Sequence, residues 1–445
     1  MIKNRKELAR FHDNRLILSA LEVALDSVKP ETLVKQAVKL DGRLSVRDIY
    51  GNVARFQKFD DVYVVGAGKA AAGMADALCS TLKDRIIAGA INIPVGTKIK
   101  SKAIAVTEAS HPVPGRSGLE GTKKIIDVLG KAGQGDLVFV LISGGGSAMM
   151  PMPALGISLQ DKRRVTSQLL RSGASIHEIN SVRKHLSAVK GGQLLRHVSR
   201  SCSVVSLILS DVIDDDIAVI ASGPTCPDNS TFKDAQKILK KYQVDSGPVT
   251  RHIGRGARGE IEETPKQRDP IFSNVRNAVI GNNVVACKSA VNYLKLRGFR
   301  AVHIGSQFDG EARDFGRFLA RLSSDLGNAP FAIVAGGETT VRLNRSRNGI
   351  GGRNQEAVLA CAMKLRRQDV AVACIGTDGI DGNSDAAGAL VSPMIAGLAR
   401  KMDVQKYLDR HDSYHALKKM HSLILTGHTG TNVNDIAIIL GAKKG

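Results

Sequence analysis

Short apolar runs and helix-length segments alternate along most of the chain. Residues 7–40 place apolar side chains at helical spacing, among them Leu18, Leu21 and Leu25, which predicts a helical hairpin interrupted at Pro30. Further apolar runs predict buried strands at 62–65, 86–93, 103–106, 137–142 and 204–209, with helices near 67–82, 118–131, 158–172 and 231–242. Continuous apolar strands separated by helices indicate a parallel sheet covered on both faces, with the chemistry at the carboxyl ends of its strands.

The pattern changes at residues 246–271, which are polar, rich in Gly and Pro, and without apolar periodicity. Beyond this stretch the alternation resumes, with strands predicted within 277–283, 300–305, 331–338, 370–379 and 421–432. Single hydrophobic cores stop growing at about 250 to 300 residues, and this chain has 445. We therefore predict two α/β domains, comprising residues 1–250 and 251–445.

The composition is that of a folded protein. Hydrophobic residues make up 43% of the chain and aromatic residues only 4%, so aliphatic side chains must build the core. Residues 1–16 are charged where a signal peptide needs an apolar stretch, and no run of about 18 apolar residues occurs, so we expect a cytosolic protein without a membrane partner. The six cysteines form no CxxC pair, which predicts reduced, structural thiols.

The net charge of +21 raises nucleic-acid binding as a hypothesis. However, Lys and Arg are spread along the whole chain, and no helix-turn-helix, zinc-finger or RNA-recognition signature is present. A positive field also concentrates small phosphates and carboxylates. We therefore favour a small anionic substrate over nucleic acid.

The stretch FDDVYVVGAGKAAAGMADAL (59–78) predicts a buried strand, a glycine-rich turn and a helix. Gly66, Gly68 and Ala71 match the loose dinucleotide pattern GxGxxG/A, but the next predicted strand has no acid at its end to hold a ribose, which disfavours an NAD enzyme. The P-loop pattern also fails, because Lys69 is followed by alanine where a hydroxyl is required. What remains is a helix start whose free N–H groups bind an anion, with the charge of Lys69 beside it.

Several carboxylates directly follow predicted strands. Asp211, Glu338 and Asp378 have this placement, which suits Mg²⁺ held through carboxylates and substrate phosphates, or a base that accepts a hydroxyl proton. The aspartates at 214–216 are better explained as a solvated turn. Asp381 lies in a Gly/Asp-rich segment that hints at a cation loop but lacks the EF-hand pattern.

Basic residues gather in two further places. Within residues 178–192, a solvated helix face and a functional role remain open alternatives for Arg183 and Lys184. Arg353 stands on a glycine turn that opens a helix, where a guanidinium can clamp a carboxylate or phosphate with two parallel hydrogen bonds. The histidines occur without an HxxxH or HExxH pair, which disfavours a zinc site.

Taken together, these motifs resemble the glycerate 2-kinase family, whose members carry a C-terminal MOFRL domain. Two small departures, in the block around His111 and at His428, leave the class unchanged. The resemblance runs in family order over nearly the whole chain and rests on GAGKAAAGMA (66–75), HPVPG (111–115), LISGGGSA (141–148), EINSVRKHLSAVKGG (178–192), LILSDVIDDDIAVIASGPT (207–225), GGETTV (336–341), GGRNQE (351–356), GTDGIDG (376–382) and TGTNVND (429–435).

The resemblance implies ATP-dependent phosphorylation of D-glycerate to 2-phosphoglycerate with Mg²⁺. It also implies that the first domain is a Rossmann-like doubly wound sheet, that the second is a smaller α/β domain with the MOFRL region, and that the active site lies in the cleft between them. Lys69 and Arg353 would be the principal catalytic residues, with Asp378 beside them. Apart from the resemblance, the strand-end position of Asp211 makes it the expected metal ligand, with Asp378 as the alternative. The expected substrate- and nucleotide-binding residues are Gly66, Gly68, Ser143, Gly144, Gly145, Gly146, Ser147, Asn282, Asn283 and Glu338.

Alternative functions stay open at this point. They are an NAD(P)-dependent oxidoreductase of a small hydroxy acid, a glycerate kinase that yields 3-phosphoglycerate, and a basic binding protein without enzymatic activity. The choice of the 2-hydroxyl rests on the resemblance alone. The oligomeric state is also open, a homo-oligomer included.

Overall fold

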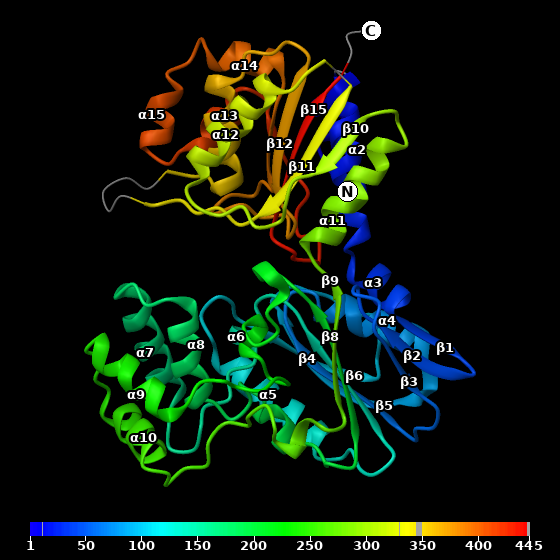
Figure 1. The fold of residues 1–445 in the computed structure, drawn as a ribbon, viewed down its shortest axis with the longest axis vertical. Helices are drawn as coiled ribbons and strands as arrows, with labels where there is room; N and C mark the ends of the chain where they lie inside the picture. Colours follow the sequence, from blue (N-terminus) through cyan, green and yellow to red (C-terminus); the bar gives the residue numbers. More distant parts are fainter. Residues whose placement is uncertain (11, 329, 344–348, 443–445) are drawn as a thin grey trace. The chain divides into compact units, whose positions relative to one another are not determined.

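The computed structural model describes residues 1–10, 12–328, 330–343 and 349–442, which form two compact units (Figure 1). The large unit comprises residues 30–281, and the small unit comprises residues 1–29 and 282–445. The boundary therefore falls at 281/282 instead of the expected 250/251, and the first 29 residues belong with the C-terminal half. The reason is that the polar stretch beginning at 246 forms helix α10 (Gly247–Ala257) of the large unit, and the strand after it completes the sheet of that unit.

Six parallel strands form the main sheet of the large unit, in the order β6-β5-β4-β7-β8-β9. Counted from β4, this is the 3-2-1-4-5-6 order of the Rossmann fold, and it confirms the Rossmann-like sheet that the family resemblance implied. The strands are β4 (Val62–Ala67), β5 (Ile86–Pro94), β6 (Ile104–Ala109), β7 (Leu137–Ile142), β8 (Ser203–Leu209) and β9 (Val275–Gly281).

Helices cover both faces of this sheet, and every residue of β4 and β7 is buried in consequence. Alternate residues of β4, Tyr63 and Val65, pack in one core cluster with Ile125 and Leu129 of α5 (Arg116–Leu129). The helices α3 (Pro30–Ala37) and α4 (Ala71–Leu82) pack against each other and against the same sheet. A small antiparallel sheet that the sequence did not predict consists of β1 (Val38–Asp41), β2 (Arg43–Arg47) and β3 (Val53–Phe56).

Four helices of the large unit form a cluster with a hydrophobic core of its own. They are α7 (Leu159–Arg171), α8 (Ile176–His185), α9 (Phe232–Lys241) and α10, and Val165, Val182 and Leu239 are among their buried side chains. The first three begin with capping boxes, in which a Ser or Thr and an acid three residues later satisfy each other's backbone N–H groups. The shorter elements of the unit are α6 (Gly146–Met149), η1 (Lys83–Arg85), η2 (Gln193–His197), η3 (Ile213–Asp215), η4 (Ile220–Ser222) and η5 (Pro270–Phe272).

The small unit contains a mixed six-stranded sheet in the order β10-β11-β15-β12-β13-β14. Its central strand β15 lies antiparallel between β11 and β12. The sequence did not predict β15, and only two residues of the strand predicted within 421–432 are extended as β14. The strands are β10 (Arg300–His303), β11 (Phe331–Gly337), β12 (Val370–Gly376), β13 (Gly388–Val391), β14 (Leu423–Ile424) and β15 (Asp435–Gly441).

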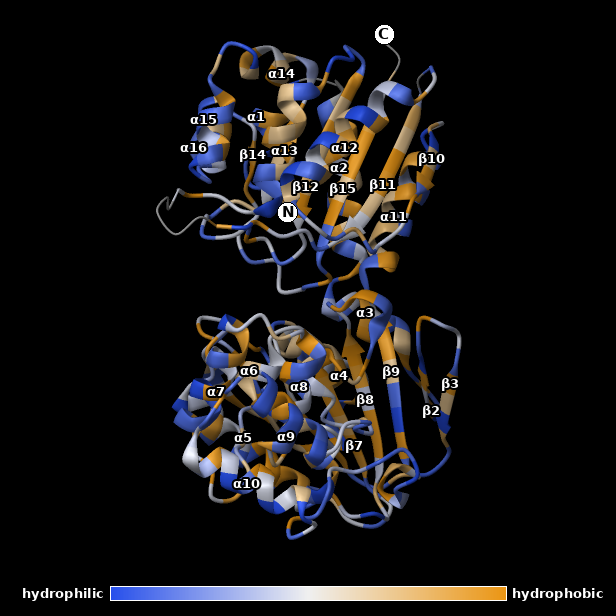
Figure 2. Ribbon diagram, turned by 60° about the vertical axis from the view of Figure 1, so that its left-hand side comes forward, coloured by the Kyte–Doolittle hydropathy of each residue, from blue (hydrophilic) through white to orange (hydrophobic). Residues whose placement is uncertain are grey.

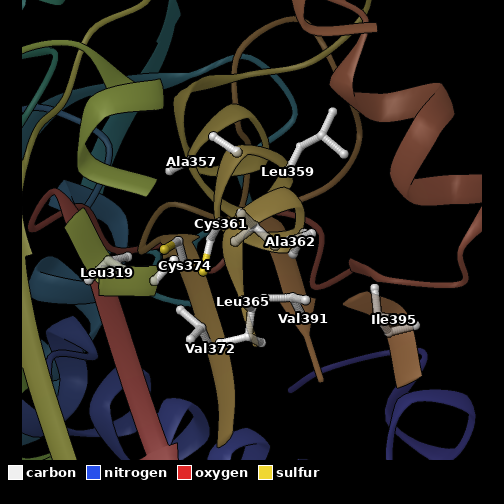
Figure 3. Close-up of a cluster of buried hydrophobic side chains, with 14 of the residues drawn as sticks. Leu319, Ala357, Leu359, Cys361, Ala362, Leu365, Val372, Cys374, Val391 and Ile395 are labelled. Carbon is white, nitrogen blue, oxygen red and sulfur yellow. The ribbon is translucent and has the colours of Figure 1, made fainter. Parts of the chain in front are cut away.

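Helices also lie on both faces of the small unit's sheet, as Figure 1 shows. On one face α2 (His12–Ser27) packs against α11 (Asn283–Lys295), and on the other α12 (Ala312–Asp325) packs against α13 (Arg353–Lys364). Figure 3 shows the buried contact between α13 and the sheet, where Cys361 and Leu365 meet Val372, Cys374 and Val391. The remaining helices are α1 (Arg5–Leu8), α14 (Pro393–Ala399), α15 (Val404–Asp409) and α16 (Ser413–Lys419).

The hydropathy of the chain follows these layers, with apolar strands inside each unit and mixed helices outside (Figure 2). All six cysteines are free thiols, as predicted, and burial raises the pKa of Cys226 and Cys361 to about 12. In the described part of the chain, no helix combines the length and the apolar composition needed to cross a membrane.

Candidate active site

The turn after β4 and the loop after β7 meet at the point where the strand order of the large unit reverses. In sheets of this order, ligands bind outside the carboxyl ends of those two strands. The backbone N–H of Lys69 donates to the carbonyl oxygen of Gly144 at 2.9 Å, and the N–H of Ala70 donates to Ser143 Oγ at 3.0 Å. The fold thus joins Lys69 to the predicted binding loop at 143–147, although more than 70 residues separate them in sequence.

Close packing explains the glycines of this turn. A Cβ atom on Gly68 would lie 2.2 Å from Ser143 Oγ, and the φ angle of Gly68 is +139°, which other residues rarely adopt. A Cβ atom on Gly66 would lie 2.3 Å from the carbonyl oxygen of Leu141. The match to a dinucleotide pattern therefore reflects how closely the two segments approach each other.

The end of β5 lacks the acid that a dinucleotide-binding enzyme uses to hold the ribose. The buried Asn92 stands there instead, and its Nδ2 donates to the carbonyl oxygens of Met149 at 2.7 Å and Gly118 at 3.0 Å. This side chain ties the sheet to α5 and α6. The geometry agrees with the sequence in disfavouring an NAD enzyme.

Ser147, in α6, is surrounded by polar side chains. Its Oγ accepts hydrogen bonds from Arg183 Nη2 and, at 2.9 Å, from Lys190 Nζ, and it lies 2.9 Å from Ser222 Oγ. The Ser222 hydroxyl donates to Asn180 Oδ1 at 3.1 Å. Arg183 therefore contacts the predicted binding loop and does not lie on a fully solvated helix face.

Three carboxylates of the small unit gather at one edge of its sheet. β11 ends at Gly337 and β12 at Gly376, and both glycines pair with Asp435, the first residue of the antiparallel β15. Glu338 follows β11 directly, and Asp378 follows β12 by two residues. The register of the sheet thus places three acids that are distant in sequence at the same edge.

Arg353, the first residue of α13, binds two of these carboxylates. Its Nε and Nη2 donate to the two carboxylate oxygens of Asp435 at 2.5 and 3.0 Å, and its Nη1 donates to Glu338 Oε1 at 2.6 Å. The two-pronged clamp predicted for Arg353 is present, and the carboxylate that it holds is the protein's own Asp435. The sequence analysis missed Asp435 as a site residue, although the motif TGTNVND ends on it.

Buried acids shape the electrostatics of this edge. Burial raises the pKa of Asp435 to about 7, against the lowering effect of the Arg353 guanidinium. Asp381 is also buried, and burial raises its pKa. Its carboxylate accepts the backbone N–H groups of Asn354 at 3.1 Å and Gln355 at 2.9 Å, so an acid of the chain already occupies the start of α13.

The two predicted asparagines have structural contacts in the small unit. Asn282 Oδ1 accepts the N–H of Val285 at 3.0 Å and so caps α11. The buried Asn283 donates from Nδ2 to the carbonyl oxygens of Val433 and Asp435, both at 2.8 Å. Asn283 therefore fixes the backbone of the residue that holds Arg353.

The remaining predicted acids lie close to the ends of strands. Asp378 is half-buried, and its Oδ1 accepts the N–H of Ile380 at 3.2 Å. Asp211 is half-buried just beyond β8. The turn at 214–216 is partly exposed, and Asp215 Oδ2 accepts the Tyr50 hydroxyl at 2.6 Å. Within the described ranges, no group of three or more His, Cys, Asp or Glu side chains is arranged to hold a metal ion.

Two family models match the chain. One, described as a domain of unknown function (DUF4147), covers residues 16–254, and the MOFRL family model covers residues 331–435. The first spans most of the large unit, and the second spans the edge where Arg353 meets Asp435.

Named relatives match over most of their length. A glycerate 2-kinase of Pyrococcus horikoshii is 40% identical over 95% of this chain and 96% of its own. A D-glycerate 2-kinase of Thermotoga maritima is 39% identical over 92% of this chain and 98% of its own. A protein of Agrobacterium vitis named putative hydroxypyruvate reductase is 40% identical over 85% of this chain and 98% of its own.

A solved structure agrees with these relatives. The crystal structure of a glycerate kinase from Thermotoga maritima has a TM-score of 0.84 with this chain, at 39% identity, and the match covers 96% of this chain and 99% of that one. The fold, both family models and the relatives that match over most of their length all indicate the same family. The chain therefore belongs to the glycerate kinase family.

Proposed function

We propose that this protein is a glycerate 2-kinase, which transfers the γ-phosphoryl group of ATP to the 2-hydroxyl of D-glycerate. The observation that carries the proposal is the 40% identity to a glycerate 2-kinase over 95% of the chain. The site geometry supports it, because each unit presents a basic residue among polar groups at the carboxyl ends of strands.

Phosphoryl transfer asks the protein mainly to position the reactants and to stabilise negative charge on the equatorial oxygens. We assign these tasks to Lys69, at the switch point of the large unit, and to Arg353, at the sheet edge of the small unit. The loop 143–147 would bind substrate or nucleotide oxygens through backbone N–H groups. The glycines of the turn at Gly66 and Gly68 would contribute by letting this loop approach closely, because the N–H of Gly68 itself donates to the carbonyl oxygen of Asn92 at 3.2 Å. Asp435 is a positioning residue in this proposal, because it holds the Arg353 guanidinium with two hydrogen bonds.

The carboxylates present fit a magnesium ion that arrives with the nucleotide. Mg²⁺ is usually held by one or two carboxylates and by substrate phosphates, so a kinase does not need a cluster of three acids. Asp211 or Asp378, each half-buried after a strand, would supply such a carboxylate, and the other would accept the proton of the reacting hydroxyl. When bound, the ion neutralises charge on the phosphates.

Purified protein with ATP, Mg²⁺ and D-glycerate tests the proposal. We expect ADP to form only when D-glycerate is present, as measured by a coupled ADP assay. Parallel incubations with L-glycerate, and with NADH and hydroxypyruvate, test the stereochemistry and the reductase alternative. Oxidation of NADH without glycerate-dependent ADP would overturn the kinase assignment.

A further inference from the structure

Three basic side chains lie near one another in the large unit, two of them in contact with Ser147, and they are called the cationic cluster below. They are Arg183 of α8, Lys190 just after α8, and Lys162 of α7. Lys190 is only 1% exposed and Lys162 only 7%, whereas Arg183 is half-buried. Buried lysines are rare unless they are paired, so the partners of this cluster decide its meaning.

Within the described residues, the cationic cluster donates its hydrogen bonds to uncharged oxygens. Arg183 donates to Ser147 Oγ, Lys190 Nζ donates to Ser147 O at 2.8 Å and to Ser147 Oγ at 2.9 Å, and Lys162 Nζ donates to Met152 O at 3.3 Å. In the described ranges no carboxylate lies within 4.0 Å of any of the three cations. Most of their N–H donors have no acceptor among these contacts.

The next two residues of α8, Lys184 and His185, differ from Arg183 because each has an acidic partner. Lys184 Nζ lies 3.3 Å from Asp228 Oδ1, and His185 Nε2 lies 2.7 Å from Glu263 Oε1. The residues that follow Arg183 on the helix therefore each have an acid partner, and Arg183 has none in the described structure. The lack of an acid is specific to the side that faces Ser147.

Burial and mutual repulsion act on the cluster together. Burial, with the charge of Arg183 added, lowers the pKa of Lys162 to about 7. Burial also lowers the pKa of Lys190 well below its usual value, and Arg183 and Lys162 lower it further. Arg183 lies in the last turn of α8, where the helix dipole supplies only about half a negative charge, which is too little to balance three cations.

We propose that the cationic cluster is the subsite that binds an anionic oxygen group of a substrate, at the Ser147 hydroxyl. This inference rests on the proposed kinase function. The group is the carboxylate of glycerate or a phosphoryl group of the nucleotide, which share the chemistry that guanidinium and ammonium donors recognise. The same loop contacts the turn of Lys69 through Gly144, so the subsite lies on the loop that meets the switch point.

The hydroxyl network around Ser147 fits this role. Asn180 Oδ1 accepts a hydrogen bond from the Ser222 hydroxyl. The Ser222 oxygen is therefore free to accept the hydrogen bond that the Ser147 hydroxyl donates. The lone pairs of Ser147 Oγ then face Arg183 and Lys190, where the oxygen substitutes for an anion. A bound anion would take over these donors and supply the missing charge.

Two variants test the subsite, with a matched control. Lys190→Met removes the buried ammonium and keeps an unbranched apolar chain, and Arg183→Gln removes the half-buried guanidinium. Lys237→Met is the control, because it removes the same charge from a side chain of α9 that is 80% exposed. D-glycerate and ATP are titrated separately into each folded protein by calorimetry, and the KM of each substrate is measured.

We expect one ligand to bind at least about tenfold more weakly to both variants, as for the loss of a charged hydrogen bond, and Lys237→Met to stay within about twofold. A raised Kd and KM for D-glycerate would identify the bound group as the carboxylate, and raised values for ATP would identify a phosphoryl group. Unchanged affinities for both ligands in folded variants would overturn the subsite. If Lys190→Met does not fold, Arg183→Gln and Arg183→Lys decide the matter, and rescue by Lys would confirm that charge is needed.

The binding measurement also separates this inference from the kinase assignment. If wild type forms no glycerate-dependent ADP but binds one of the anions through the cluster, the subsite stands and the proposed function fails. If wild type is an active kinase and both variants keep wild-type affinities, the function stands and the subsite fails.

Discussion

Two clusters of charge, one in each unit, are built in opposite ways. In the small unit, Arg353 is surrounded by acids and donates to both oxygens of Asp435 and to Glu338. In the large unit, the cationic cluster of Lys162, Arg183 and Lys190 donates hydrogen bonds to hydroxyl and carbonyl oxygens, with no carboxylate acceptor in the described ranges. The guanidinium of the first cluster has acid partners within the protein, whereas among the described residues the basic groups of the second have none.

This difference indicates different tasks. A guanidinium held by a bidentate carboxylate is fixed in position before any ligand arrives, which is the preorganisation that electrostatic catalysis needs. Buried basic groups without an acid partner gain a balancing charge when an anion binds, which suits recognition of a substrate. We therefore propose that Arg353 stabilises charge during transfer and that the cationic cluster binds substrate.

The sharpest test of the Arg353 assignment is truncation, with Lys69 as the second case. Lys69→Ala and Arg353→Ala should each lower kcat by about a hundredfold or more, the effect of removing one electrostatic stabiliser. Steady-state kinetics with D-glycerate and ATP give kcat and KM separately. A normal kcat with a raised KM would show that the residue only binds substrate.

Removing the partner of Arg353 should have a smaller effect. Asp435→Asn keeps the shape of the side chain but takes away the negative charge, and we expect kcat to fall about tenfold with little change in KM, because the guanidinium loses its fixed position. Asn283→Ala is the companion variant, since Asn283 holds the backbone of residue 435. An unchanged kcat in both would remove Asp435 from the account.

The two clusters also predict opposite effects of pH on stability. The pKa of Asp435 is raised to about 7. Its contribution to the free energy of unfolding is therefore fully present below about pH 4 and is lost as the pH rises toward 7. The pKa of Lys162 is lowered to about 7, so its contribution is present above about pH 10 and is lost as the pH falls toward 7.

Thermal melts across this range measure both contributions. Asp435→Asn should flatten the decline of Tm between about pH 4 and 7, and Lys162→Met should flatten the rise of Tm above about pH 7. We expect each effect to be a few degrees, which corresponds to about 1 kcal/mol or more in the free energy of unfolding. Parallel Tm curves for wild type and both variants would contradict the assigned pKa values.

The smallest effect is expected at the second partner of Arg353. The side chain of Glu338 is 44% exposed, and solvent weakens its ion pair with Arg353. Glu338→Gln should change kcat/KM by no more than about fivefold, corresponding to about 1 kcal/mol. If Glu338→Gln lowers activity as much as Asp435→Asn does, the burial of the two carboxylates does not determine how much each contributes to holding Arg353.

The sequence predicted the parallel sheet and the placement of Lys69 well, because apolar runs and a glycine turn are local signals. It missed β15, a central strand at the far end of the chain, whose apolar run was not assigned to a strand. It missed the pairing of Arg353 with Asp435 because only the register of the sheet brings together residues 82 positions apart. Lys162 has the sequence of a solvated helix face, and only the folded structure buries it, with its Nζ donating to the carbonyl oxygen of Met152.

The identity of the product tests the central claim most directly. Purified protein is incubated with ATP, Mg²⁺ and D-glycerate, and the products are examined by phosphorus NMR against authentic 2- and 3-phosphoglycerate. We predict ADP and 2-phosphoglycerate in equal amounts, with neither formed when glycerate is omitted. A 3-phosphoglycerate signal, or ADP that forms independently of glycerate, would contradict the account.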